Sequence, residues 1–344
     1  MSRHVKFAAL ATALMGIASL TTMAGPASAD PAHPVIGFAV YDMTSWVSWG
    51  QQGAEKIAEA NNAKLLWRSA RGDVNTQISQ IQELLNQKVD VLVVAAVNSA
   101  TLGPQLEAAK KAGIPVVATN MRIDPPADQN TIAYVGPNDV GAGEQEAQAV
   151  VDALKGKGGV VILQGPIGQS AEQDRSQGIK NVLAKNPGIK VLAMQPGNWD
   201  RTQAYKLTQD WLSRYGNDLN GVIAENDDMA IGAIQALKEK SLNGKIPVSG
   251  IDGIKDGMRA VKSGDLIATN LQDAAIELGE AVQVAVDHLN KKTYPQKALL
   301  NMPVVTKDNV QHYYDQLYVE PKKFIAALPE LVKANLASGN YANQ

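Results

Sequence analysis

The stretch of sequence that decides the fold is residues 89–119, VDVLVVAAVNSATLGPQLEAAKKAGIPVVAT. It contains two short apolar runs, Val89–Ala95 and Ile114–Thr119. Between them lies an amphipathic segment, Thr101–Lys111, which is followed by Gly113. A glycine directly after a helix commonly marks its C-terminal end. Continuous apolar runs are typical of strands that are buried on both faces. The stretch therefore predicts a strand, a helix and a second, parallel strand.

The same alternation continues outward in both directions from this unit. Further buried strands are predicted at Val35–Val40, Lys64–Arg68, Val160–Leu163, Lys190–Met194, Gly221–Ala224, Pro247–Ile251 and Leu266–Leu271. Helices are predicted after Asp73 and over roughly 138–155, 172–185, 201–215, 228–240, 254–263 and 274–291. This order predicts an α/β protein with doubly wound parallel sheets. A chain of this length favours two such sheets, and the boundary is predicted at 134–138, YVGPN.

Residues 1–29 are predicted to be a signal peptide. A basic start at residues 3–6 precedes an apolar run over 7–23, and residues 27–29, ASA, supply the pattern cut by signal peptidase. The apolar run is also long enough for an uncleaved membrane anchor, which is the alternative. We expect export to the periplasm and cleavage near Ala29. Export argues against functions that depend on ATP, NAD or the genome.

The composition narrows the remaining classes of function. The chain has no cysteine and four scattered histidines, so neither a disulfide framework nor a metal site is expected. The lack of cysteine also excludes a lipid-modified N-terminal cysteine, the usual tether of exported proteins in bacteria with a single membrane. The formal charge is −2 and no block of like charge occurs, so no nucleic-acid or membrane surface is expected.

Sequence motifs for catalysis are missing. The chain contains no HExxH, no GxSxG, no phosphate-binding GxxxxGK[ST] loop and no GxGxxG after a strand. The pair Asp227-Asp228 opens a predicted helix, where carboxylates favour the helix dipole. A secreted hydrolase is one alternative, but no convincing pair of catalytic carboxylates supports it. We therefore expect neither an enzyme nor a cofactor.

Polar and aromatic side chains gather where the predicted strands end, which is where open parallel sheets bind ligands. These segments are 41–49, 120–122, 169–175, 198–201, 225–230, 250–253 and 268–272. Tryptophan rings can cover the C–H faces of a sugar, while carboxylates, amides and arginine can bind its hydroxyls. Arg175 and Asp252 have opposite charges, which favours a neutral ligand. The segments therefore predict a site for a carbohydrate or polyol.

Four of these regions resemble the periplasmic sugar-binding proteins of ABC transporters, of the ribose- and galactose-binding type. They are Gln164-Gly165 with Arg175-Ser176-Gln177-Gly178, Gln195-Pro196 with Trp199-Asp200-Arg201, Glu225-Asn226-Asp227-Asp228-Met229-Ala230, and Gly250-Ile251-Asp252-Gly253. All four occur in the order and spacing of the family. The resemblance extends to about residue 305. It implies a type I periplasmic binding protein, with two α/β lobes that close on a ligand around a hinge.

The resemblance implies ligand contacts at eight positions: Thr44, Trp46, Asn120, Arg175, Trp199, Asn226, Asp252 and Gln272. Asp42, Trp49 and Arg122 are weaker candidates. Each has a plainer alternative role, such as core packing for a tryptophan or helix capping for Thr44. One departure concerns the fourth strand, after which many family members have Asp-Arg. This chain has Asn120-Met121-Arg122, so its arginine is displaced by one residue.

The resemblance also implies three hinge crossings, near Gly136, Gln272 and Met302. The expected N-terminal lobe comprises 34–136 and 273–302, the C-terminal lobe 137–272 and 303–320, and the C-terminal helical tail 321–344. The implied function is to trap a neutral sugar or polyol and to deliver it, as a monomer, to an ABC importer permease. Two alternatives stay open: presentation of the ligand to a chemotaxis or sensor-kinase receptor, and binding of a non-sugar small molecule.

Overall fold

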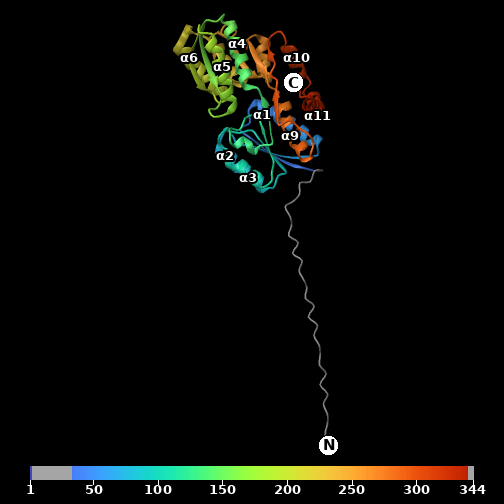
Figure 1. Cartoon of the computed structure of the whole chain (residues 1–344). Helices are drawn as coiled ribbons and strands as arrows, with labels where there is room; N and C mark the ends of the chain where they lie inside the picture. The colour runs from blue at the N-terminus through green and yellow to red at the C-terminus, as the bar shows by residue number, and fades with distance from the viewer. Residues whose placement is uncertain (2–32, 340–344) are drawn as a thin grey trace.

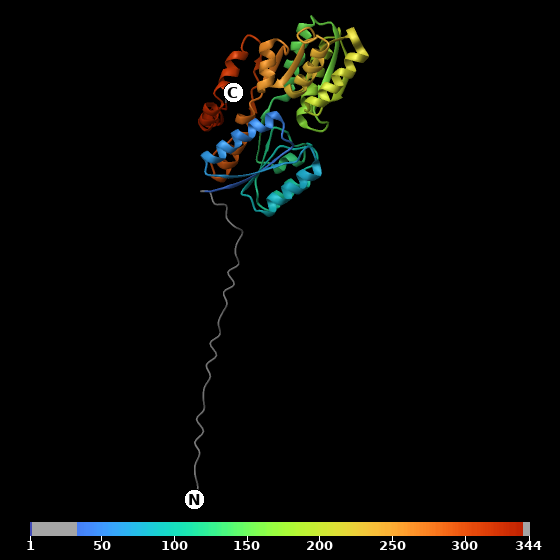
Figure 2. The ribbon, with the colours of Figure 1, turned by 180° about the vertical axis from the view of Figure 1, so that it is seen from behind.

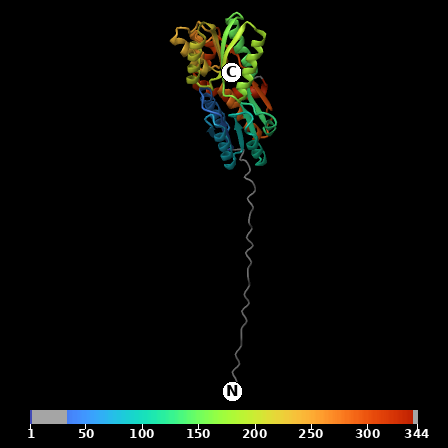
Figure 3. The same ribbon diagram turned by 90° about the vertical axis from the view of Figure 1, so that its left-hand side faces the viewer.

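The computed structural model describes Met1 and residues 33–339, so the predicted signal peptide 1–29 and residues 340–344 lie outside the described residues. The described chain forms two α/β lobes, each built on a six-stranded sheet (Figures 1, 2 and 3). The prediction of two doubly wound parallel sheets is therefore confirmed. None of the helices within the described residues is long and apolar enough to cross a bilayer.

The N-terminal lobe has the strand order β11-β5-β4-β3-β1-β2, with all neighbouring strands parallel. Its strands are β1 (Val35–Val40), β2 (Lys64–Ser69), β3 (Val91–Val94), β4 (Val116–Thr119), β5 (Ala133–Pro137) and β11 (Lys297–Leu300). Its helices are α1 (Ser45–Ala60), α2 (Val74–Asn86), α3 (Gly103–Lys111) and α9 (Ala274–Leu289), with a 3₁₀ turn over Ala127–Asn130.

The C-terminal lobe repeats this plan with the strand order β12-β10-β9-β8-β6-β7, in which only β12 is antiparallel to its neighbour. Its strands are β6 (Gly158–Gln164), β7 (Ile189–Pro196), β8 (Leu219–Ala224), β9 (Val248–Asp252), β10 (Ala268–Leu271) and β12 (Val304–Val305). Its helices are α4 (Asp139–Ala153), α5 (Ser170–Lys185), α6 (Arg201–Tyr215), α7 (Asp227–Glu239) and α8 (Lys255–Ser263), with a 3₁₀ turn over Gly216–Asp218.

Some local predictions were wrong in detail. The runs predicted at Lys64–Arg68 and Lys190–Met194 form β2 and β7, which are edge strands and are partly exposed along most of their length. They are therefore not buried on both faces, unlike the central strands of each sheet. The third helix begins at Gly103, two residues later than predicted, with a proline in its first turn. The short strands β11 and β12 were not predicted.

The chain passes from one sheet to the other at three places in the hinge. These lie between β5 and α4, between β10 and α9, and between β11 and β12. Helix α9 packs against α1 of the N-terminal lobe, whereas α4 packs against α5 of the C-terminal lobe. The second passage contains Gln272, which comes directly after β10. This residue is therefore held between the two lobes.

The C-terminal segment makes a fourth passage, outside the hinge. After β12, α10 (Val310–Tyr314) packs on α8, and a π turn (Asp315–Val319) leads into α11 (Pro321–Ser338). The Tyr318 hydroxyl donates a hydrogen bond to the Gly253 carbonyl of the C-terminal lobe, at 2.7 Å. Helix α11 then packs on α1 and α9 of the N-terminal lobe, beside the hinge (Figure 1). The segment thus contacts both lobes.

Candidate ligand-binding site

A narrow cavity lies between the lobes, at the carboxyl ends of strands from both sheets. Its free volume is about 20 Å³, on the order of one water molecule. The residues around it are Tyr41, Thr44, Trp46, Asn120, Met121, Ala171, Arg175, Trp199, Asn226, Asp252 and Gln272. This set includes all eight residues named first as candidates from the sequence. The structure therefore brings them to one place, and their role as ligand contacts stays a prediction.

Arg175 is the central cation of this cavity and is almost completely buried. Its Nε donates to Asp139 Oδ1 at 2.8 Å, its Nη1 to the Glu225 carbonyl at 2.6 Å and its Nη2 to Gln272 Oε1 at 2.7 Å. Asp252 Oδ1 lies 3.9 Å from Nη1. Burial lowers the pKa of Arg175, but Asp139 and Asp252 outweigh it and raise the pKa overall. The guanidinium is therefore a fixed positive charge in a defined orientation.

Two buried tryptophans contribute to the cavity, one from each lobe. The Trp46 indole donates to the Gln272 carbonyl at 2.7 Å, and the Trp199 indole donates to Gln169 Oε1 at 2.7 Å. The Arg175 guanidinium lies over the Trp199 ring, 5.5 Å from its centroid. Gly165 packs so closely under this ring that a Cβ atom there would overlap it. Both rings are therefore held by a hydrogen bond and by packing.

Three residues of the cavity have backbone conformations with positive φ: Asn120 (58°), Trp199 (57°) and Asp252 (123°). Such conformations are uncommon for residues other than glycine, and each costs on the order of 1–3 kcal/mol. Asn120 directly follows β4, Asp252 is the last residue of β9, and Trp199 lies one residue before the N-cap of α6. Strain of this kind concentrates at binding sites, where it aims side chains in a required direction.

Two buried oxygen atoms of the cavity have no hydrogen-bond partner among the residues that the structure describes. They are Asn120 Oδ1 and Asp252 Oδ2. Burial raises the pKa of Asp252 well above its usual range, although Arg175 opposes the shift. An unpaired buried acceptor costs about 1–3 kcal/mol, so such atoms usually meet a donor from outside the chain. Both atoms are therefore candidates to accept hydrogen bonds from a ligand.

Thr44 and Asn226 each perform a structural task as well. Thr44 Oγ1 accepts from the Val47 backbone N–H at the start of α1, and Asn226 Oδ1 accepts from the Met229 N–H at the start of α7. The capping role considered for Thr44 is thus present in the structure, and both caps line the cavity. The remaining donors of Asn226 and the hydroxyl of Thr44 can still contact a ligand.

The three weaker candidates do not line the cavity. Asp42 accepts a hydrogen bond from the Met43 N–H at 2.7 Å. Trp49 stacks on Phe324 of α11, with ring centroids 6.0 Å apart. Arg122 extends across the cleft to the C-terminal lobe, where it meets the Asp174 carboxylate. Arg122 therefore pairs across the cleft instead of lining the cavity.

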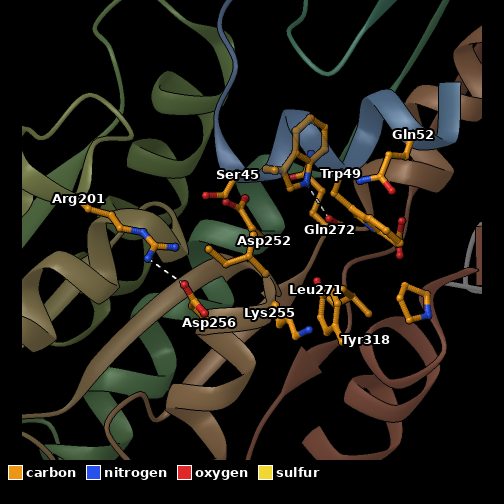
Figure 4. Close-up of a pocket in the computed structure, with 14 residues that line it drawn as sticks. Ser45, Trp49, Gln52, Arg201, Asp252, Lys255, Asp256, Leu271, Gln272 and Tyr318 are labelled. Carbon is orange, nitrogen blue, oxygen red and sulfur yellow. Dashed lines mark hydrogen bonds and ion pairs between the residues drawn. The ribbon is translucent and has the colours of Figure 1, made fainter. Parts of the chain in front are cut away.

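A wider groove, lined by Trp49, Asp252 and Tyr318 among others, lies beside the cavity (Figure 4). Its volume is about 420 Å³, and it shares Trp46, Asp252 and Gln272 with the cavity. Trp49 and Tyr318 form part of its wall, and Arg201 is paired there with Asp256 at 2.9 Å. The groove is larger, but the strained residues and both unpaired acceptors surround the inner cavity. The inner cavity is therefore the candidate ligand site.

Contacts across the cleft hold the lobes together around the cavity. The Ser99 N–H donates to the Gly168 carbonyl at 3.0 Å, and the Ser45 hydroxyl donates to Asp228 Oδ1 at 3.2 Å. The Arg122 N–H donates to the Ser170 hydroxyl at 2.7 Å. Each of these bonds joins the N-terminal lobe to the C-terminal lobe. The structure is therefore that of a closed two-lobed clamp.

Several residues that shape the site were not among the eight candidates named first. Tyr41, Met121 and Ala171 line the cavity, and all three lie within or beside the polar segments noted at the strand ends. Glu277 supports the site from α9, a helix that is apolar on nearly all sides. A glutamate in such a helix is the signal that could have found it, because a buried carboxylate requires a partner.

Comparison with known proteins agrees with this arrangement. Residues 36–293 match the family described as periplasmic binding protein domain. The xylitol-binding protein of Mycolicibacterium smegmatis is 44% identical over 338 residues, which are 98% of this chain and 96% of that protein.

Two solved structures are also similar. An ABC transporter periplasmic solute-binding protein from Actinobacillus succinogenes with bound D-allose is 30% identical, with a TM-score of 0.76, and the match covers 81% of this chain and 100% of that one. An ABC transporter solute-binding protein from Bacillus halodurans with bound myo-inositol is 27% identical, with a TM-score of 0.77 and coverage of 83% and 98%. These matches confirm the prediction of a binding protein rather than an enzyme. The chain belongs to the periplasmic binding protein domain family.

Proposed function

We propose that this protein binds a small, neutral, polyhydroxylated molecule between its lobes and delivers it to an ABC importer. The single observation that carries the proposal is the pair of buried, unpaired acceptors, Asn120 Oδ1 and Asp252 Oδ2, in a cavity with two tryptophans. Because the most similar relative named above is a xylitol-binding protein, a five-carbon sugar alcohol such as xylitol is the first candidate.

The chemistry of the cavity matches such a ligand group by group. Hydroxyl hydrogens can be donated to Asn120 and Asp252, and hydroxyl oxygens can accept from the Arg175 guanidinium. The rings of Trp46 and Trp199 offer apolar surface to the C–H groups. A ligand that lacks one hydroxyl would leave a buried group unpaired, so the site would discriminate strongly against deoxy analogues.

The charges around the cavity favour a neutral ligand over an anion or a cation. Burial raises the pKa of Asp139 and Asp252, and it raises the pKa of Glu225 to about 8. These shifts mean that the region already disfavours negative charge, so an anionic ligand would meet the same penalty. A cationic ligand would approach the buried guanidinium of Arg175.

Closure of the lobes gives the binding its mechanism. Asn120 and Trp46 come from the N-terminal lobe, whereas Arg175, Trp199 and Asp252 come from the C-terminal lobe. The cavity described above has room for about one water molecule, so the lobes must separate to admit a polyol and then close around it. A ligand that contacts both sets stabilises this ligand-filled closed form, which would be the one that docks on the permease. The family supports export to the periplasm and a permease partner. Cleavage near Ala29 and action as a monomer complete the proposal.

Isothermal titration calorimetry of the exported protein with xylitol, other pentitols, D-allose and myo-inositol tests the proposal. We expect micromolar or tighter binding of at least one neutral polyol and no binding of xylonate, its anionic analogue. Asp252→Asn replaces an acceptor with a donor and should weaken binding at least tenfold. Asp256→Asn, which alters a carboxylate of the neighbouring groove, is the matched control and should change affinity less than twofold.

Two results would overturn the proposal. One is the absence of a binding signal with every neutral polyol and sugar tested. The other is an equal effect of the substitutions at Asp252 and Asp256, which would place the ligand outside the inner cavity. Capture of a chemotaxis or sensor-kinase receptor by the loaded protein, without a permease, would support the sensory alternative instead.

A further inference from the structure

We infer that Glu277 is a positioning residue that sets which end of two site amides faces the ligand; this inference rests on the proposed function. Glu277 lies on α9 of the N-terminal lobe and is fully buried. Its Oε1 accepts from Asn120 Nδ2 at 3.0 Å, and its Oε2 accepts from Gln272 Nε2 at 2.8 Å. Each carboxylate oxygen thus holds one amide of the cavity.

The inference follows from the asymmetry of an amide group. An amide has an NH₂ end that donates and an oxygen end that accepts, whereas an ionised carboxylate only accepts. Burial raises the pKa of Glu277 to about 8, but the hydrogen bonds from Gln272 and Asn120 favour the ionised form, in which both oxygens accept. Glu277 therefore draws both NH₂ ends toward itself and turns both amide oxygens away. Gln272 Oε1 then accepts from Arg175 Nη2, at 2.7 Å. Asn120 Oδ1 is left as the unpaired acceptor of the cavity.

A reversed amide would disrupt the site at either position. Reversal of Gln272 would place its NH₂ group against the guanidinium of Arg175, where two donors would face each other. Reversal of Asn120 would present a donor to the ligand in place of an acceptor, and would set its oxygen against the carboxylate of Glu277. By opposing both reversals, Glu277 keeps the cavity selective for hydroxyl groups that donate.

The backbone of Asn120 is held independently, so that Glu277 is needed for the side chain alone. The Asn120 N–H donates to the Val135 carbonyl at 2.9 Å, and the Tyr134 hydroxyl donates to the Asn120 carbonyl at 3.0 Å. The positive φ of this residue directs its side chain inward. What remains free is rotation about the bond to the amide, which the carboxylate removes.

The same contacts form a continuous chain of hydrogen bonds across the hinge. It runs from Arg175 in the C-terminal lobe through Gln272 in the hinge to Glu277 and Asn120 in the N-terminal lobe. The groups that meet the ligand from the two lobes are therefore aligned with each other through one carboxylate. No contact of Glu277 with the ligand is required for this effect.

Glu280, one turn further along α9, provides a matched comparison. It is also fully buried, and its Oε1 accepts from Asn335 Nδ2 of α11 at 2.9 Å. This hydrogen bond involves one oxygen of Glu280, so a glutamine at this position can still accept it. A glutamine in place of Glu277 has one oxygen for two NH₂ donors, and one site amide must turn or lose its partner.

The test compares xylitol affinity and unfolding free energy in four variants. Glu277→Gln should weaken xylitol binding about ten- to a hundredfold, because one buried donor is left unpaired. Asn120→Asp alone should also weaken binding, since the new carboxylate at position 120 would face the carboxylate of Glu277. The double variant should restore affinity to within about threefold of the wild type: the new amide donates to the new carboxylate and accepts from Gln272. Glu280→Gln should leave affinity unchanged.

The rescue is the decisive readout, because a purely structural role would not produce it. Wild-type affinity in Glu277→Gln, or a double variant no better than the product of the two single effects, would overturn the inference. A lower unfolding free energy of Glu277→Gln with unchanged affinity would also overturn it. If the wild type itself binds no xylitol or other polyol, the proposed function fails. In that case, the unfolding free energies of Glu277→Gln, Asn120→Asp and the double variant, measured without ligand, test whether the hydrogen-bond chain exists. An interaction energy between the two substitutions would support the chain, and additive effects would refute it.

Discussion

Replacement of Asp174 by alanine should weaken ligand binding, although Asp174 does not line the candidate ligand cavity. Asp174 accepts from Arg122 Nε at 3.0 Å and from Nη2 at 2.9 Å, which is a bidentate pair across the cleft. We call these two residues the rim pair. They belong to different lobes, so the pair exists only while the lobes are closed. The pair therefore lowers the free energy of the closed form relative to the open form, and this difference contributes to the apparent affinity for the ligand.

The size of the effect follows from the exposure and geometry of the rim pair. The side chains of Arg122 and Asp174 are 37% and 26% exposed, so solvent screens their attraction. Exposed pairs contribute about 0.2–1 kcal/mol, and the bidentate geometry places this pair near the upper end of the range. A loss of about 1 kcal/mol from the closed form corresponds to an approximately fivefold weaker apparent Kd.

Calorimetric titration with xylitol, combined with small-angle X-ray scattering, measures this effect. Asp174→Ala should raise Kd about fivefold and shift the ligand-free protein toward more open dimensions. The difference from the wild type should shrink as salt rises toward about 1 M, where the Debye length falls to about 3 Å. The reasoning fails if Kd at low salt is the same for Asp174→Ala and the wild type.

The control is a similar ion pair inside one lobe. Arg68 Nη2 and Glu83 Oε1 are 3.0 Å apart, both in the N-terminal lobe, with side chains 29% and 51% exposed. Glu83→Ala removes a comparable surface pair but does not connect the lobes. It should leave Kd unchanged. An equal loss of affinity in this control would show that general loss of surface charge, rather than the rim pair, causes the effect.

Three further predictions follow from the structure. Gly165→Ala should displace the Trp199 ring, because the added methyl group overlaps it, and should abolish measurable xylitol binding while the chain stays folded; wild-type affinity would contradict this. Burial raises the pKa of Glu225 and Asp227 to about 8 from ordinary values of 4.5 and 3.8, so the folded protein binds more protons than the unfolded chain between pH 5 and 8. The unfolding free energy should therefore fall as pH rises through this window, by up to about 1.4 kcal/mol per pH unit per group, and denaturant titrations with the opposite slope would refute the assignment. Removal of residues 321–344 deletes α11, with its buried apolar side chains and the fourth link between the lobes. We expect the unfolding free energy to fall by an amount on the order of 5 kcal/mol and the radius of gyration of the ligand-free protein to increase. An unchanged radius of gyration by X-ray scattering would refute the idea that α11 restrains opening of the lobes.

Most of the fold could be predicted from the sequence, because its strands and helices have local signatures. The runs that become β1 to β4 and β6 to β10 are largely apolar, and the helices between them begin at residues such as Asp73 and Asn138 that cap the backbone. Strands β11 and β12 were not predicted because they lack such a local signature. They have four and two residues, too few for a recognisable period.

The sequence by itself predicted which segments would line the candidate ligand site. Parallel strands end at a common edge of each sheet, so polar residues after separate strands had to meet there. This rule gathers the polar segments of each lobe at one sheet edge, and the structure brings the two edges together, with Asn120, Arg175 and Asp252 around a single cavity. It required no knowledge of how any one side chain is oriented.

Only the tertiary structure decided which groups those side chains meet. Arg122 bonds Asp174, and Glu277 bonds Asn120, a residue 157 positions away along the chain. Local periodicity carries no information on such partners, because they depend on the packing of one lobe against the other and on the path of the hinge. The direction of a buried polar group is set by the nearest donor or acceptor in space, and in this protein that group comes from a distant segment of the sequence.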